Sequence, residues 1–141
     1  TMKKAFILLL IPFFAISCTS YEDYGDQTQI KTVNLVVEQA DWVEHTDADG
    51  RNRYYSCSFS MPEINSNVYE YGSVQTYVTF ENAQQTMPYV RHYEDINGTQ
   101  WTRTVDYDYA VGNMAIYVTN SDFIKDLPEK MTFRVVIMWQ E

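Results

Sequence analysis

Apolar and polar residues alternate with a period of two along most of this 141-residue chain. The alternating segments are separated by turn signals, and no stretch sustains the 3.6-residue apolar period of an amphipathic helix. Tyr, Val and Thr, which favour extended backbone, are frequent. The pattern therefore predicts an all-β chain.

About seven strands are expected, with turns or irregular crossings between them. In the segment 54–61 the predicted core-facing residues alternate with serines, and the segments 73–81 and 131–139 alternate in the same way. The expected strands cover residues 30–37, 54–61, 73–81, 89–94, 99–109, 114–119 and 131–139. The residues expected to face the core of the segment 54–61 are Tyr55, Cys57, Phe59 and Met61.

One hairpin has a strong local signal. Asn97 and Gly98 stand between two alternating runs, and both residue types tolerate the positive φ of a tight turn. The sequon formed with Thr99 is interpreted as turn chemistry rather than as a glycosylation site. A hairpin is therefore predicted across residues 95–98.

Seven short antiparallel strands bury their apolar faces best when one sheet packs on another. We therefore expect an immunoglobulin-like antiparallel β-sandwich, with a small closed β-barrel as the alternative. One domain, over residues 30–141, accounts for the body of the chain, which is long enough to form a core without disulfides. Cys57 is expected to be a buried free thiol.

The start of the chain has a different character. Two lysines precede the twelve-residue apolar run 5–16, which suits a secretory signal segment and is shorter than the roughly 20 residues of a spanning helix. Small residues one and three positions before Cys18 resemble the lipobox of bacterial lipoproteins. The resemblance implies cleavage of residues 1–17 and lipidation of Cys18 on its sulfur and its new amino terminus. An ordinary signal peptide with a bystander cysteine is the alternative.

Acidic residues follow this cysteine. Glu22, Asp23 and Asp26 resemble the export signal that directs lipoproteins of Bacteroides-like bacteria to the outer face of the outer membrane. The segment 18–29 is thus expected to be a lipidated acidic tether. Cell-surface display is expected, and a periplasm-facing anchor is the alternative.

The body of the chain also resembles a family. The runs YYSCSFSMP, YGSVQTYV, MPY, VDYDYAVGNMAIYV and FRVVIMW are similar to those of small surface lipoproteins common in gut Bacteroidetes. The family implies no catalytic residues, so the resemblance bears on fold and source rather than on activity.

The net charge and the absence of known motifs restrict the classes of function that this chain could have. The 19 acidic residues outnumber the 10 basic ones, which makes nucleic acid an unfavourable partner. His45 and His92 have no nucleophile motif beside them, and no phosphate loop, CxxC or HExxH motif occurs. The run Asp47 to Asn52 departs from a calcium loop at its first and twelfth positions. We expect no cofactor, no metal and no enzymatic activity.

Aromatic residues supply the remaining candidates for a binding site. Three tyrosines, Tyr54, Tyr77 and Tyr117, fall on outward positions, where they either form cross-strand contacts or stack on sugar rings. Trp101 and Arg103 share a core-facing set and are expected at the rim of the sandwich, within reach of a ligand.

Two functions from different classes follow. The first is a non-enzymatic lipoprotein that binds a protein or another envelope partner. The second is a surface glycan-binding module that uses the exposed aromatic side chains. A concave face that gathers these aromatics would favour the glycan, whereas a flat patch including Val136 and Met138 would favour a protein partner.

Overall fold

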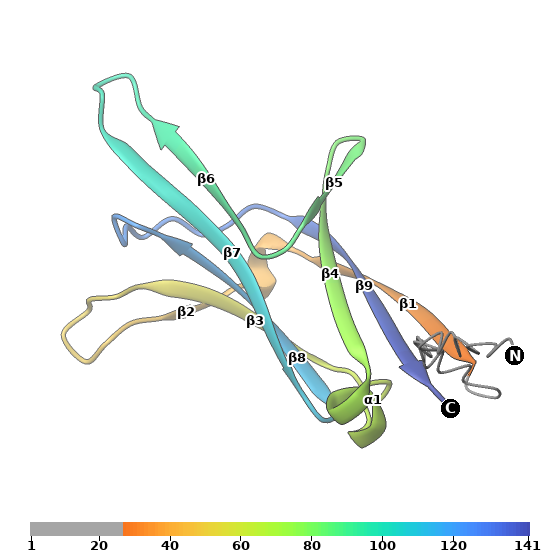
Figure 1. Ribbon diagram of the computed structural model, residues 1–141. Helices are drawn as coiled ribbons and strands as arrows, with labels where there is room; N and C mark the ends of the chain where they lie inside the picture. Colours follow the sequence, from red (N-terminus) through yellow and green to blue (C-terminus); the bar gives the residue numbers. More distant parts are fainter. Residues whose placement is uncertain (1–26) are drawn as a thin grey trace, which may run out of the picture.

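Nine strands form two antiparallel sheets over residues 27–141, the part of the chain that the computed structural model describes (Figure 1). Sheet A has the order β1 (Thr28–Val37), β9 (Met131–Gln140), β4 (Ser73–Phe80) and β5 (Ala83–Thr86). Sheet B has the order β2 (Val43–His45), β3 (Tyr54–Ser60), β8 (Asn113–Asn120), β7 (Gln100–Ala110) and β6 (Tyr89–Glu94). The predicted all-β sandwich is confirmed, and these residues do not close into the alternative barrel. As in the immunoglobulin fold, two sheets enclose one core, but the order of the strands within the sheets differs from the immunoglobulin order.

The core lies between the sheets and follows the predicted alternation. Tyr55 and Met61 are buried, and Phe59 packs partly buried against the same cluster. The apolar residues with no exposed surface are Val37, Ile64, Val68, Val78, Val105, Ile116, Val118, Phe133, Val135 and Ile137. Burial of one such side chain stabilises the fold by roughly 1.5–3 kcal/mol. The packing of one sheet on the other thus buries the inward residues of the period-two pattern, and this burial is the main stabilising interaction.

Two strands were missed by the sequence pattern. Strand β2 has only three residues, and it places His45, expected in a loop, opposite Tyr54 on β3. Strand β5 reads AQQT with all four residues exposed, so it contains no apolar alternation. Each strand forms a hairpin with its neighbour in the sequence, β2 with β3 and β5 with β4, and the partner supplies backbone hydrogen bonds that alternation of side chains does not report.

The predicted hairpin joins β6 to β7. The side chain of Asp95 accepts hydrogen bonds from the backbone amides of Asn97, at 2.8 Å, and Thr99, at 2.9 Å. Gly98 has a φ of +78°, which glycine adopts without strain. The sequon therefore lies in a tight turn, as its turn interpretation predicts.

A short helix, α1 (Ser66–Tyr71), lies in the crossing between β3 and β4. The Asn65 side chain caps it by accepting a hydrogen bond from the amide of Val68 at 3.0 Å. A methyl group at Gly72, directly after the helix, would approach the carbonyl oxygen of Met138 to 2.5 Å. The absence of a side chain at Gly72 thus allows the helix to end tightly against β9.

Cys57 is a free cysteine that is only half-buried, which corrects the prediction of a buried thiol. The residue points inward on β3, as predicted, and packs against the edge of the core. Burial, followed by the nearby Asp41 carboxylate, raises the pKa of the Cys57 thiol. The thiol therefore remains protonated, and less reactive than an ordinary cysteine, at neutral pH.

Candidate functional site

The five candidate binding residues lie in three separate places. Tyr54 and Tyr117 share the outer face of sheet B, whereas Tyr77 lies on the outer face of sheet A. Trp101 and Arg103 lie on the inward side of β7, toward the β6–β7 hairpin. The structure therefore does not gather the aromatic candidates on one concave face.

The outer face of sheet B carries an aromatic and acidic cluster. The rings of Tyr54 and Tyr117 lie 6.1 Å apart, and the His45 ring stacks on Tyr54 at 4.7 Å. The Tyr117 hydroxyl donates a 3.0 Å hydrogen bond to the carboxylate of Asp108. Burial raises the pKa of Tyr117, and the hydrogen bond to Asp108 adds to the shift. Tyr117 thus acts as a neutral donor across two strands.

A serine and a histidine also meet in this cluster. Nε2 of His45 lies 2.7 Å from the Ser56 hydroxyl oxygen, a contact that sequence reasoning missed because β2 was not predicted. A nucleophilic serine also needs an oriented histidine and donors for the oxyanion. Ser56 is only 8% exposed, in the middle of a strand paired on both sides. The contact therefore fits the packing of the edge strand β2 better than it fits catalysis.

The outer face of sheet A has a different composition, without acidic side chains. We call this surface the acid-free face; it comprises the even-numbered residues of β1 and β9, the odd-numbered residues of β4, and Gln84 and Thr86 of β5. Its one charged residue, Arg134, lies 4.7 Å from the centre of the Tyr77 ring. Ile30 and Val36 are 64% and 51% exposed, and Val136 and Met138 are half-exposed beside them.

Trp101 lies beside a cleft near the tip of the β6–β7 hairpin. Its ring stacks on Tyr93, with centroids 5.5 Å apart and planes at 13°. The cleft encloses about 520 Å³, and its lining includes both rings together with Glu94 and Gln100. Trp101 is therefore partly exposed on a projecting hairpin rather than enclosed in the core.

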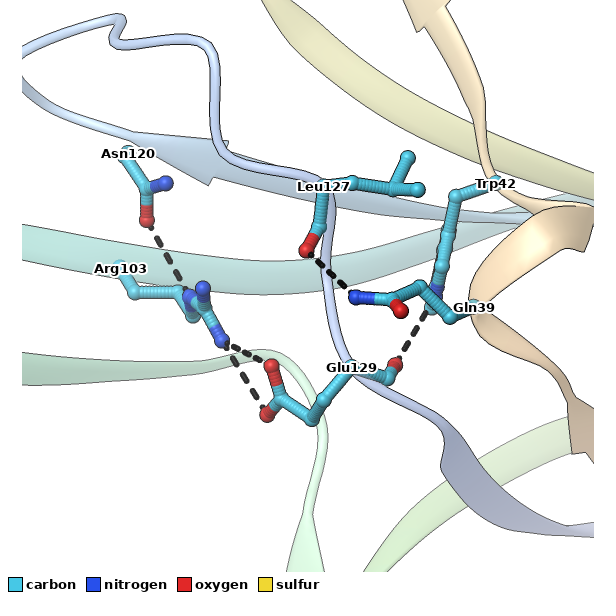
Figure 2. A network of polar contacts seen from close by, with 6 residues as sticks. All are labelled: Gln39, Trp42, Arg103, Asn120, Leu127 and Glu129. Atoms are coloured by element: carbon cyan, nitrogen blue, oxygen red, sulfur yellow. Dashed lines mark hydrogen bonds and ion pairs between the residues drawn. The ribbon is translucent and has the colours of Figure 1, made fainter.

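Arg103 takes part in a network of polar contacts within the fold (Figure 2). Its guanidinium donates to both carboxylate oxygens of Glu129, at 2.9 and 3.2 Å, and to the side-chain oxygen of Asn120, at 3.1 Å. Trp42 donates its indole N–H to the carbonyl oxygen of Glu129 at 3.1 Å, and Gln39 reaches the carbonyl of Leu127. The arginine thus fastens the connection between β8 and β9 to the sandwich. The expectation that Arg103 reaches toward a ligand is not supported by this geometry.

This ion pair predicts a specific acid dependence of stability. Burial alone would raise the pKa of Glu129, but hydrogen bonds from its own backbone amide and from Arg103 hold that pKa below its ordinary value of 4.5. The ionised Glu129 therefore contributes its full stabilisation when the pH is above the ordinary pKa. This stabilisation is lost as the pH falls through the lower pKa of the folded protein. We expect Glu129→Gln to lose about 1 kcal/mol of unfolding free energy at neutral pH, because the glutamate is partly screened by solvent.

Urea unfolding at neutral and acidic pH would measure both effects. The variant should show a smaller loss of stability on acidification than the unaltered protein. Glu70→Gln, at an exposed position of α1, provides a control in which neither quantity changes much. An unaltered acid dependence in Glu129→Gln would contradict the assignment.

The acidic loop between β2 and β3 has the contacts of a solvated turn. Asn52 donates to the carboxylate of Asp47, and Arg51 lies 3.3 Å from the carboxylate of Asp49. Gly50 has a φ of +76°, which suits the turn. Within residues 27–141, no group of three or more His, Cys, Asp or Glu side chains gathers as metal ligands do.

The candidate anchor and export residues, Cys18, Glu22, Asp23 and Asp26, lie outside the described residues. Among residues 27–141, no helix is both long and apolar enough to span a bilayer. Comparison of the chain with known protein families, with curated proteins and with solved structures found no match.

Proposed function

We propose that this chain is a non-enzymatic lipoprotein, anchored to the outer membrane through Cys18, that binds a protein partner through its acid-free face. The observation that carries the proposal is the composition of that face. The protein contains 19 acidic residues, yet none lies on the outward positions of this four-stranded sheet. Protein interfaces are depleted of Asp, Glu and Lys at their centres and enriched in Tyr, Met and Arg, which the acid-free face presents.

The geometry of the face also favours a broad partner. Ile30 pairs across the strands with Met138, and Thr32 pairs with Val136, so Ile30, Met138 and Val136 form one apolar area on β1 and β9. A sheet face of this kind presents a large, nearly planar surface, whereas a small molecule is usually held in a concave site. The adjacent outward positions of Ile30, Val136 and Met138 therefore support the protein partner over the glycan.

The anchor restricts where such a partner would be found. Strand β1 begins ten residues after Cys18. An extended chain spans at most about 3.6 Å per residue, so a lipid on Cys18 would keep the start of sheet A within about 35 Å of the membrane surface. The partner is therefore expected in the same membrane or at its surface.

Site-directed photocrosslinking in cells would test the acid-free face. A photoreactive residue at Val136 is expected to give one discrete adduct, and Thr32→Glu should weaken that adduct about a hundredfold because it buries an unpaired carboxylate in the interface. The same probe at Ser58, exposed on the outer side of sheet B, is the matched control. Equal adducts from both positions, or adducts that Thr32→Glu leaves unchanged, would contradict the proposal.

A surface glycan-binding module is the second candidate, and the cleft beside Tyr93 and Trp101 favours it. Aromatic rings beside Glu94 and Gln100 combine stacking surface with hydrogen-bonding groups, a combination suited to sugars. A polysaccharide that binds the protein and loses binding in Trp101→Ala would support this candidate. Binding unaffected by that substitution would retire it.

A further inference from the structure

Strand β7 is covered by a neighbour over only half of its length on one side. Strand β6 pairs with it from the hairpin as far as Tyr89 opposite Val105, whereas β7 continues to Ala110. Across the opening, β5 pairs with β4 only from Tyr77 onward, and the amide of Met87 donates a 3.0 Å hydrogen bond to the carbonyl of Thr76, so that no strand pairs with residues 73–75 on that side. Figure 1 shows β5 and β6 beside the upper parts of β4 and β7, while the lower parts run toward α1 without a strand between them.

The backbone groups at this open edge can be assigned from the hydrogen bonds around β7. Thr102 exchanges hydrogen bonds with Ser121, both at 2.8 Å, on the side of β8. Backbone groups alternate in direction along a strand, so the odd-numbered residues of β7 point toward β6. Tyr107 and Tyr109 lie beyond the end of β6, and they therefore present their N–H and C=O groups to the opening.

An aromatic groove runs along the same edge. Tyr69, Pro88, Tyr107, Asp108 and Tyr109 enclose about 610 Å³. The rings of Tyr69 and Tyr109 meet edge to face at 6.2 Å, and Tyr69 is 52% exposed. The Tyr107 hydroxyl donates to the carbonyl of Val74 at 2.9 Å and forms the floor between the two sheets. Side chains from an added strand would thus enter a groove lined mainly by tyrosine rings, with the Tyr107 hydroxyl held in place at its floor.

Two carboxylates flank the edge on the opposite, outer side. Asp106 and Asp108 face outward from β7, and neither belongs to any of the ion pairs found among residues 27–141. Burial, followed by the charge of Asp108, raises the pKa of Asp106, as expected for a carboxylate without a nearby cation. A basic side chain placed beside them would complement this charge.

We propose that the free edge of β7 at Tyr107 and Tyr109 binds an extended peptide segment of a partner protein, in which basic residues alternate with apolar ones. The segment continues the line of β6 as an added strand and exchanges backbone hydrogen bonds with β7. Its apolar side chains lie between Tyr69 and Tyr109, and its basic side chains lie beside Asp106 and Asp108. A second copy of this chain paired edge to edge would bring like charges together, so the occupant is a different chain. The site is separate from the acid-free face and does not depend on it.

The test uses the full chain in detergent and a fluorescent eight-residue peptide of alternating lysine and valine. The peptide is expected to bind, and a glutamate–valine peptide of the same length is not. Methylation of the backbone nitrogens that would face β7 should abolish binding, because it removes strand hydrogen bonds and keeps the charge. Binding should also protect the amide hydrogens of Tyr107 and Tyr109 from exchange.

Protein variants locate the site. Asp106→Asn combined with Asp108→Asn is expected to weaken binding about tenfold, which corresponds to the loss of two partly exposed ion pairs. Asp47→Asn combined with Asp49→Asn, in the loop between β2 and β3, removes the same charge and should leave affinity unchanged. Thr32→Glu should also leave it unchanged, which separates this site from the acid-free face.

Three results would overturn the proposal. The first is an absence of peptide binding, in which case Asp106 and Asp108 merely guard an exposed edge against association. The second is binding that tolerates backbone methylation, which would indicate attraction between charges alone. The third is protection that appears at another strand edge instead of at Tyr107 and Tyr109.

Discussion

Replacing Cys18 with alanine is expected to abolish lipidation and to release the protein from the membrane or hold it as a precursor. The sulfur of Cys18 is the only atom in a lipobox-like context that could carry the diacylglyceryl group. Each buried methylene of an acyl chain contributes about 0.8 kcal/mol to membrane binding, so two or three chains hold a protein stably and their loss is decisive. Metabolic labelling with a fatty-acid analogue, followed by fractionation, measures both outcomes.

Cys57→Ala is the matched control for this experiment. Cys57 lies half-buried on β3 with a raised pKa, a poor position for modification, so the variant should keep its label and its membrane fraction. Neutralising Glu22, Asp23 and Asp26 together should leave acylation intact and reduce display, measured by protease digestion of whole cells. Label that persists in Cys18→Ala would contradict the lipobox interpretation.

The alternation of side chains predicted the sandwich because β4, β8 and β9 each bury one face. On β4 and β9 the inward residues of the structure are those that alternation assigned, including Val78 and Phe133. The pattern failed at β5, where AQQT buries no side chain. Strand β5 instead forms a tight hairpin with β4, in which Phe80 pairs with Ala83, and backbone pairing of this kind leaves no apolar alternation in the sequence.

The candidate site was less predictable for a related reason. Alternation states that Tyr54, Tyr77 and Tyr117 point outward, but it does not state from which sheet. Tyr54 and Tyr117 meet because β3 pairs with β8, a contact between segments about sixty residues apart, while Tyr77 faces the opposite side of the molecule. A shared outward direction was therefore insufficient evidence for a common binding platform.

Arg103 shows the same limit at a single residue. An arginine within a core-facing run predicted a position at the rim of the sandwich with a ligand within reach. Its partner, Glu129, belongs to the connection before β9, and nothing near Arg103 in the sequence specifies that contact. The Arg103 side chain is consequently only 13% exposed and forms an ion pair with Glu129. It therefore stabilises the fold and is not free to contact a ligand.

Trp42→Ala is expected to cause the largest loss of stability of any substitution considered. Trp42 is 5% exposed, packs edge to face on Phe133 with centroids 6.5 Å apart, and holds the carbonyl of Glu129 through its indole N–H. Its removal leaves a cavity above Phe133 and releases the connection that Arg103 also fastens. Replacement of a buried tryptophan by alanine costs about 3–5 kcal/mol, a large share of the roughly 5–15 kcal/mol that stabilises an ordinary domain.

Urea unfolding of Trp42→Ala beside Trp101→Ala would test this expectation within one protein. Both substitutions remove the same indole, but Trp101 lies partly exposed on the hairpin and stacks only on Tyr93 among the aromatic rings, so its loss should cost about 1 kcal/mol. Trp42→Phe should recover part of the stability lost in Trp42→Ala, because it restores ring packing without the hydrogen bond. If the two alanine variants were destabilised equally, Trp101 would belong to the core, and the cleft beside it could not serve as an independent binding surface.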